Sequence, residues 1–136
     1  MSVTARFAHR FRFLALLQAS LVVGAVYDLI FAVFMIVAPG LPTRILRLPL
    51  PGEAFYLWLM AVLLGMLACL YLLAAHDPRR YSGIIVVAIA GRLCGALALA
   101  VAGIAEPRLL PGIAVLAVCD FALGLAPALF WLPLRR

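Results

Sequence analysis

The sequence predicts an all-α membrane protein, a single domain over residues 1–136 built as a bundle of four transmembrane helices. Of its 136 residues, 68% are hydrophobic and only 12% are charged, a composition typical of integral membrane proteins. Four apolar runs are separated by short polar or proline-rich segments. Each run reaches the length of about twenty residues with which an α-helix crosses a bilayer core.

The first predicted helix covers residues 13–38. The basic sequence MSVTARFAHRFR precedes it directly, an arrangement that resembles a signal peptide. The apolar part of a signal peptide is usually about 7–15 residues long. This run continues well past that length and shows no small-x-small cleavage site before a polar stretch, so we expect an uncleaved transmembrane helix.

The segment that follows, residues 39–53, has the sequence PGLPTRILRLPLPGE, with four prolines. Proline at this density forbids a continuous helix. Between Pro42 and Pro49 the sequence TRILRL can form one amphipathic turn at the membrane surface, with Arg44 and Arg47 facing lipid headgroups. An ordinary connector is favoured over a functional lid, and both interpretations remain open.

Three further helices are predicted, over residues 54–75, 83–105 and 109–132. The sequence HDPRRY from His76 separates the second helix from the third. A short turn at residues 106–108 separates the third from the fourth. Because both connections are short, neighbouring helices should run antiparallel.

Arginine distribution predicts the orientation of the bundle. The chain has eleven arginines and no lysine, and seven of the eleven lie in the N-terminus, the 76–81 turn and the C-terminus. The positive-inside rule then places both termini in the cytoplasm of a bacterial inner membrane. The net charge of +6 is therefore assigned to topology and lipid headgroups, and no nucleic-acid partner is expected, because no aromatic-interleaved basic patch occurs.

The third run carries Arg92 near its middle. An arginine at the bilayer centre costs between about 2.5 and more than 10 kcal/mol, so it should face the bundle interior with an acidic partner. Asp28 and Asp120 are the two candidates. Counted from the flanking arginines at about 1.5 Å per residue, the three Cα positions lie within roughly 6 Å of one another in depth. The sequence leaves open which aspartate pairs with Arg92.

Small residues share the helix faces of these aspartates, and Tyr27 lies beside Asp28. Small residues permit close helix approach. The glycines predicted to pack helices together are Gly24, Gly65, Gly91, Gly95 and Gly124. Gly91 and Gly95 form a GxxxG pair, which indicates packing within the bundle or, alternatively, a homodimer face.

Two aspartates and one arginine leave a formal charge of −1, so one aspartate is expected to hold a proton. Two interpretations of the cluster remain open. It is either a structural ion pair that fixes helix register, which is favoured, or a site that exchanges a proton or cation as the bundle moves.

Neither a cofactor nor a metal nor a catalytic residue is predicted. His9 and His76 lie at the expected cytoplasmic edge rather than at the depth of a bis-histidine haem. No spacing typical of metal ligands occurs. The three cysteines fall inside apolar runs without a CxxC pair and are expected to be small buried hydrophobes.

Four stretches carry a family resemblance: YDLIFA from Tyr27, HDPRRY from His76, AGRLCG around Arg92 and CDFALGLAPALFWL from Cys119. Together they resemble small four-helix bacterial membrane proteins of the DoxX-like type. The resemblance implies a four-helix inner-membrane protein and brings no catalytic residue. A lysine would be expected at the position of Arg92 in such proteins, and arginine changes the donor geometry there.

The function predicted first is that of an accessory subunit or oligomeric membrane component, partnered by the lipid bilayer and by copies of itself or a larger complex, and not an enzyme. The first alternative is a small proton-coupled transporter or permease. The second is a membrane enzyme or redox component that acts on a lipid or quinone through Cys94 or Cys119.

Overall fold

The computed structural model describes residues 3–49 and 52–134, and every regular element in those residues is helical. The α-helices are α1 (Val3–Val37), α2 (Gly40–Leu46), α3 (Ala54–His76), α4 (Ser82–Ala105) and α5 (Leu110–Trp131), and two 3-10 turns are η1 (Pro107–Leu109) and η2 (Leu132–Leu134). The described residues contain no strand, so the all-α prediction is confirmed.

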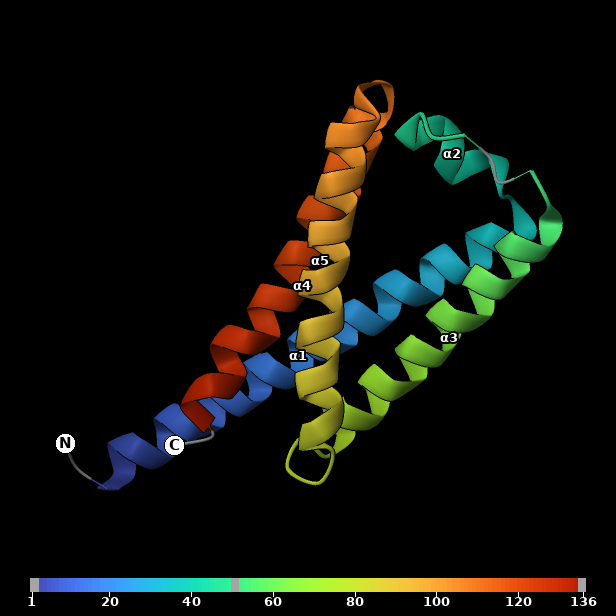
Figure 1. Ribbon diagram of the computed structural model, residues 1–136. Helices are drawn as coiled ribbons and strands as arrows, with labels where there is room; N and C mark the ends of the chain where they lie inside the picture. The colour runs from blue at the N-terminus through green and yellow to red at the C-terminus, as the bar shows by residue number, and fades with distance from the viewer. Residues whose placement is uncertain (1–2, 50–51, 135–136) are drawn as a thin grey trace.

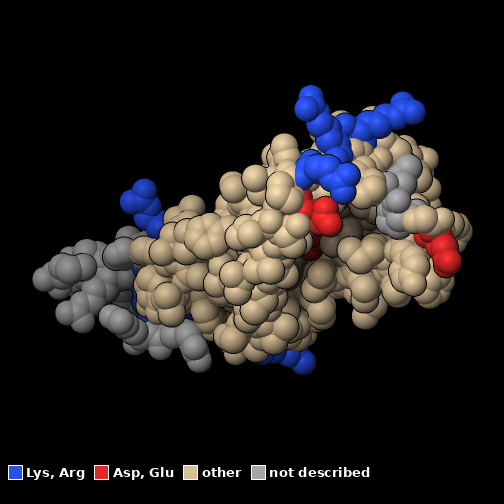
Figure 2. All heavy atoms as spheres, turned by 45° about the horizontal axis from the view of Figure 1, so that its top comes forward, with Lys and Arg blue, Asp and Glu red and all other residues tan. Residues whose placement is uncertain are grey.

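Four of these helices are long and apolar enough to cross a membrane. The spans lie within Arg10–Val37, Ala54–His76, Ser82–Ala105 and Pro107–Leu134. Large apolar side chains are exposed along each span, and charged groups occupy only a few projecting spots on the face shown in Figure 2. The protein is therefore a multi-pass membrane protein, as the four apolar runs predicted.

Helix α1 begins at Val3, ten residues before the predicted start at residue 13. The basic N-terminal sequence contains neither proline nor glycine, the two residues that most strongly disfavour a helix. Hydropathy marks where the apolar span begins, whereas the helix itself extends further. At its other end α1 stops at Val37, because Pro39 disfavours helical backbone in the residue before it.

The four long helices form two pairs, α1 with α3 and α4 with α5. A further contact joins α1 to α5, and α3 touches α4 much less. The pairs cross and diverge toward the upper part of Figure 1, where α2 and the turn between α4 and α5 lie. The beginning of α1, the end of α5 and the turn between α3 and α4 lie at the opposite end.

The connector between α1 and α3 contains more structure than the single turn expected. Helix α2 has seven residues and begins at Gly40, and Pro42 is accommodated because proline lacks only a donor that the first helical turn leaves unused. The helix ends at Leu46 and is capped by Arg47, whose backbone is left-handed with φ 53° and whose N–H donates to the carbonyls of Thr43 and Arg44. Pro51, the last of the four prolines, lies outside the described residues.

Gly112 at the start of α5 holds this connector against the bundle. A Cβ atom at Gly112 would lie 1.8 Å from the carbonyl oxygen of Leu46, a distance that no side chain tolerates. The end of α2 therefore rests on the backbone of α5. The connector is part of the packed structure at this point.

Two clusters of buried side chains form the core. The first consists of Leu17, Leu21, Ala74, Ala75 and Ile85, and the second of Ala25, Ala68, Tyr71 and Ala88. Most of these side chains are small, so the helices approach closely. The amide of Gln18 also donates to the carbonyl of Ala75 at 2.9 Å, which ties α1 to α3.

Candidate functional site: a buried charge cluster

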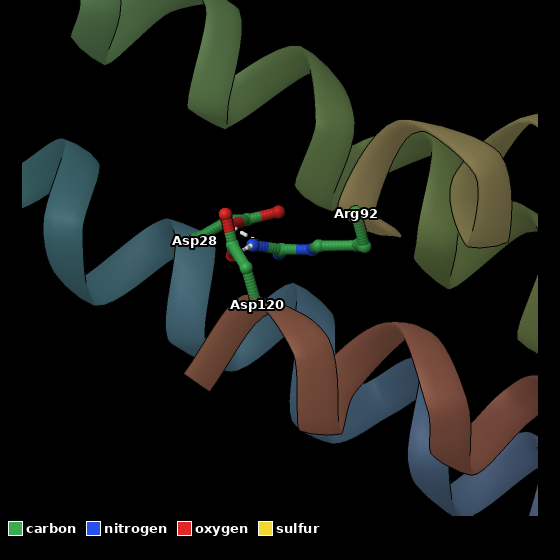
Figure 3. Close-up of polar contacts among 3 residues, drawn as sticks. All are labelled: Asp28, Arg92 and Asp120. Carbon is green, nitrogen blue, oxygen red and sulfur yellow. Dashed lines mark hydrogen bonds and ion pairs between the residues drawn. The ribbon is translucent and has the colours of Figure 1, made fainter. Parts of the chain in front are cut away.

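Arg92 lies between two aspartates from different helices (Figure 3). Its Nη2 donates to Oδ1 of Asp28, on α1, and its Nη1 donates to Oδ1 of Asp120, on α5, both at 2.5 Å. The side chain of Arg92 is 9% exposed, that of Asp28 is 0% exposed and that of Asp120 is 20% exposed. The sequence left the partner of Arg92 open, and in the structure both aspartates contact it.

Helical spacing explains how the fold brings these groups together. Asp28 shares a buried face of α1 with Leu21, Ala25 and Ala32, which lie seven, three and four positions away. Arg92 shares a buried face of α4 with Ala88 and Ala96, each four positions away. Residues at such spacings lie on one side of a helix. The charged side chains therefore emerge between small residues, where neighbouring helices come closest.

Two tyrosines flank the guanidinium group of Arg92. Its Cζ atom lies 5.4 Å from the ring centroid of Tyr27 and 5.5 Å from that of Tyr71, within the range of a cation–π interaction. Tyr71 comes from α3, so each of the four long helices contributes to the cluster.

Tyr27 was expected beside Asp28, whereas the sequence analysis missed Tyr71. A signal for Tyr71 exists, because it lies three residues from both Ala68 and Ala74 on the buried face of α3. The small-residue pattern applied to the aspartates could have identified it.

Three of the five predicted packing glycines contact the cluster. A Cβ at Gly24 would lie 3.4 Å from the ring of Tyr71, one at Gly95 would lie 3.2 Å from Oδ2 of Asp120, and one at Gly124 would lie 3.0 Å from Cβ of Arg92. These glycines therefore permit the close approach that brings the charged groups into contact.

The other two predicted glycines have no such neighbour. A Cβ at Gly65 or Gly91 would meet no described atom within 4 Å. At about 100° per residue, Gly91 is about 100° from Arg92 around α4 whereas Gly95 is about 60° away. Only one glycine of the GxxxG pair therefore faces the cluster.

Some polar atoms of the cluster lack a partner. Among the described residues, Oδ2 of Asp28 and Nε of Arg92 are buried without a hydrogen bond. A cavity of about 10 Å³ adjoins Arg92 and is lined also by Ser20 and Tyr71. That volume is close to the minimum for one water molecule, so the cavity is far too small for an organic cofactor or substrate.

Metal-ligating side chains do not gather around this cluster in the part of the chain that the structure describes. Within the described ranges, no group of three histidine, cysteine, aspartate or glutamate side chains is placed to hold a metal ion. Cys69 and Cys94 are exposed and Cys119 is partly exposed, so the expectation that the cysteines are buried is wrong for the first two. Lipid tails are as apolar as the bundle interior, so cysteine is also tolerated on the outer surface. The side chain of His9 lies outside the described residues.

The fold and the cluster define the class: a small multi-pass membrane protein with a buried Asp–Arg–Asp cluster at its centre. Comparison with known proteins adds no family to this description, because no family model, no curated protein and no solved structure matches the chain. The cluster and the surfaces around it are therefore the features that bear on function.

Proposed function

We propose that the protein is a structural component of a bacterial inner membrane, acting as an accessory subunit or as an oligomer, with the charge cluster fixing its core. The observation that carries this proposal is that Arg92 contacts a residue from each of the other three long helices. Through Asp28 and Tyr71 it reaches the pair α1 and α3, and through Asp120 it reaches its own partner α5.

The surroundings of Arg92 support a structural role. The adjoining cavity holds about 10 Å³, which leaves no room for a substrate beside the charged groups. In lipid, the hydrophobic effect does not drive helices together, and close packing and polar contacts supply the specificity of association. A guanidinium that joins both helix pairs provides such a contact.

The orientation proposed is that of both termini in the cytoplasm. Arg10, Arg12, Arg79 and Arg80 support it, because they belong to the end of the bundle where α1 begins and α3 turns into α4. Arg135 and Arg136, which also entered the arginine count, lie outside the described residues. Membership of the DoxX-like group remains a proposal supported by the four stretches quoted for it.

The mass of the complex extracted from native membranes in a mild detergent tests the accessory or oligomeric role. Stoichiometric co-purification with a larger assembly identifies an accessory subunit, and a defined multiple of the 14.7 kDa chain identifies an oligomer. A monomer that no other protein accompanies contradicts the proposal.

A second candidate function is a small proton-coupled transporter, and one observation favours it. Oδ2 of Asp28 is buried without a partner, and two carboxylates share one guanidinium. A carboxylate that lacks its own cation is suited to take up and release a proton.

Proton flux into vesicles reconstituted with the purified protein tests the transporter. Flux that Asp120→Asn abolishes and Glu106→Gln preserves supports it, since Glu106 is an exposed carboxylate outside the cluster. Flux no faster than that of protein-free vesicles removes this candidate.

A further inference from the structure

A second and much larger cavity lies at the end of the bundle where α1 begins. Its volume is about 720 Å³, and its walls come from the first turns of the α1 span, the turn between α3 and α4, and the end of α5. This volume falls within the range of about 300–1,000 Å³ typical of ligand pockets. The charge cluster contributes no lining residue to it.

The polar part of the wall is basic. Arg10 from α1, Arg79 and Ser82 line the cavity, and neither arginine forms an ion pair with any described residue. The neighbouring carboxylate belongs to Asp77, whose Oδ1 accepts hydrogen bonds from the backbone N–H groups of Arg79 and Arg80. Asp77 itself does not line the cavity. Two guanidinium groups are therefore available to an anion.

An unpaired donor lies in the same wall. Trp131 lines the cavity, and its Nε1 atom is buried without a hydrogen-bond partner among the described residues. The Nε1 atom has almost no accessible surface, so a ligand that fills the cavity does not reach it, and Trp131 contributes only the surface of its ring to this wall.

The rest of the wall is apolar and lies at the depth of a membrane surface. Phe11, Leu14, Val86 and Leu134 contribute to it. Arg10 lies just before the apolar run of α1, and Arg79 lies between the apolar spans Ala54–His76 and Ser82–Ala105, so the basic groups are at headgroup level and the apolar wall extends toward the acyl chains. The cavity thus suits a ligand with an anionic head and a hydrocarbon tail.

We propose that this cavity binds one anionic phospholipid. The phosphate oxygens accept hydrogen bonds from Arg10, Arg79 and the Ser82 hydroxyl, and an acyl chain lies on the apolar wall. Basic pockets between transmembrane helices bind anionic headgroups in this manner. A zwitterionic lipid carries an extra positive charge that two arginines disfavour.

Native mass spectrometry of the delipidated full-length protein tests the proposal. Phosphatidylglycerol and phosphatidylcholine with identical acyl chains are titrated against it in a neutral detergent. We expect phosphatidylglycerol to bind preferentially and the double variant Arg10→Gln, Arg79→Gln to bind it about 30-fold more weakly, from the usual contribution of an arginine near an anionic headgroup.

The matched control is the double variant Arg12→Gln, Arg80→Gln. It removes the same charge from the same end of α1 and the same turn, but neither residue lines the cavity. This variant should keep the wild-type lipid preference. Equal weakening in both double variants would show diffuse surface attraction and overturn the proposal, as would equal binding of the two lipids.

A second measurement distinguishes the lipid from a free anion and remains valid if a variant folds poorly. In a Trp58→Phe protein, Trp131 is the only tryptophan, so its fluorescence reports on the cavity. We expect phosphatidylglycerol to change its emission and an equal concentration of inorganic phosphate to leave it unchanged. A response to inorganic phosphate alone, or to phosphatidylcholine as strongly as to phosphatidylglycerol, contradicts the proposed occupant.

Discussion

Replacing Arg92 by glutamine removes the positive charge of the cluster and leaves the carboxylates of Asp28 and Asp120 without their cationic partner. Removing one partner of a buried ion pair typically costs about 3–5 kcal/mol. Two carboxylates lose the same partner here, but Asp120 is 20% exposed and reaches water more easily than Asp28, which is 0% exposed. We therefore expect the free energy of unfolding to fall by about 4 kcal/mol. This is a large part of the roughly 5–15 kcal/mol by which a typical domain is stable.

The triple variant Arg92→Gln, Asp28→Asn, Asp120→Asn separates the effect of charge from that of shape. It retains side chains of similar size but carries no charge in the cluster. Its free energy of unfolding should fall by only about 1–3 kcal/mol, because the buried groups that remain imperfectly paired are polar and uncharged. Removing three charged side chains should thus destabilise the protein less than removing one.

Unfolding by sodium dodecyl sulfate from a mild detergent, followed by circular dichroism, measures these differences. We expect the unfolding midpoint to be highest in the wild type, lower in the triple variant and lowest in Arg92→Gln alone. A triple variant that unfolds as early as the single one would refute the reasoning, because the loss would then not come from unpaired buried charge.

Three substitutions of single residues test the packing. Gly112→Ala should displace α2, because the new methyl group would lie 1.8 Å from the carbonyl oxygen of Leu46; we expect a loss of about 1–3 kcal/mol, and faster proteolysis between residues 40 and 49 would reveal the displacement. The methyl group of Gly91→Ala meets open space, so this variant should gain about 0.5–1 kcal/mol in free energy of unfolding from the higher helix propensity of alanine, seen as a higher unfolding midpoint. A loss of free energy of the same size would instead place Gly91 in a packed interface. Arg47→Gly should relieve the left-handed backbone at φ 53° and stabilise the connector by about 1 kcal/mol, seen as slower proteolysis of the same segment.

The sequence predicts the four spans well because hydropathy is a property of each local stretch, and an apolar stretch of sufficient length partitions into the bilayer by its own hydrophobicity. It places the start of the first helix ten residues too late, because the basic residues before the span carry no signal that ends a helix. The proximity of Asp28, Arg92 and Asp120 follows from one physical requirement, that charges within an apolar span must face one another.

Other contacts could not be predicted because they depend on the path of the whole chain. Gly112 lies against Leu46, 66 positions earlier in the sequence, and no local pattern records where the connector between α1 and α3 returns to the bundle. The GxxxG pair is a similar case, because only Gly95 has a neighbour in the cluster. The motif specifies two small residues one turn apart on α4, whereas the path of α5 determines which of the two glycines α5 packs against.

The geometry of the cluster also accounts for helix register, which small residues alone specify poorly. Alanine and glycine faces resemble one another at each turn, so a helix displaced by one turn, about 5.4 Å, would still find small residues opposite. Such a displacement of α4 would break both contacts of Arg92, which are 2.5 Å long, and would leave Arg92 and Asp28 buried without charged partners. On this argument the charge cluster selects one register among several that packing would permit, which supports the proposed structural role over that of a site that exchanges a proton or cation.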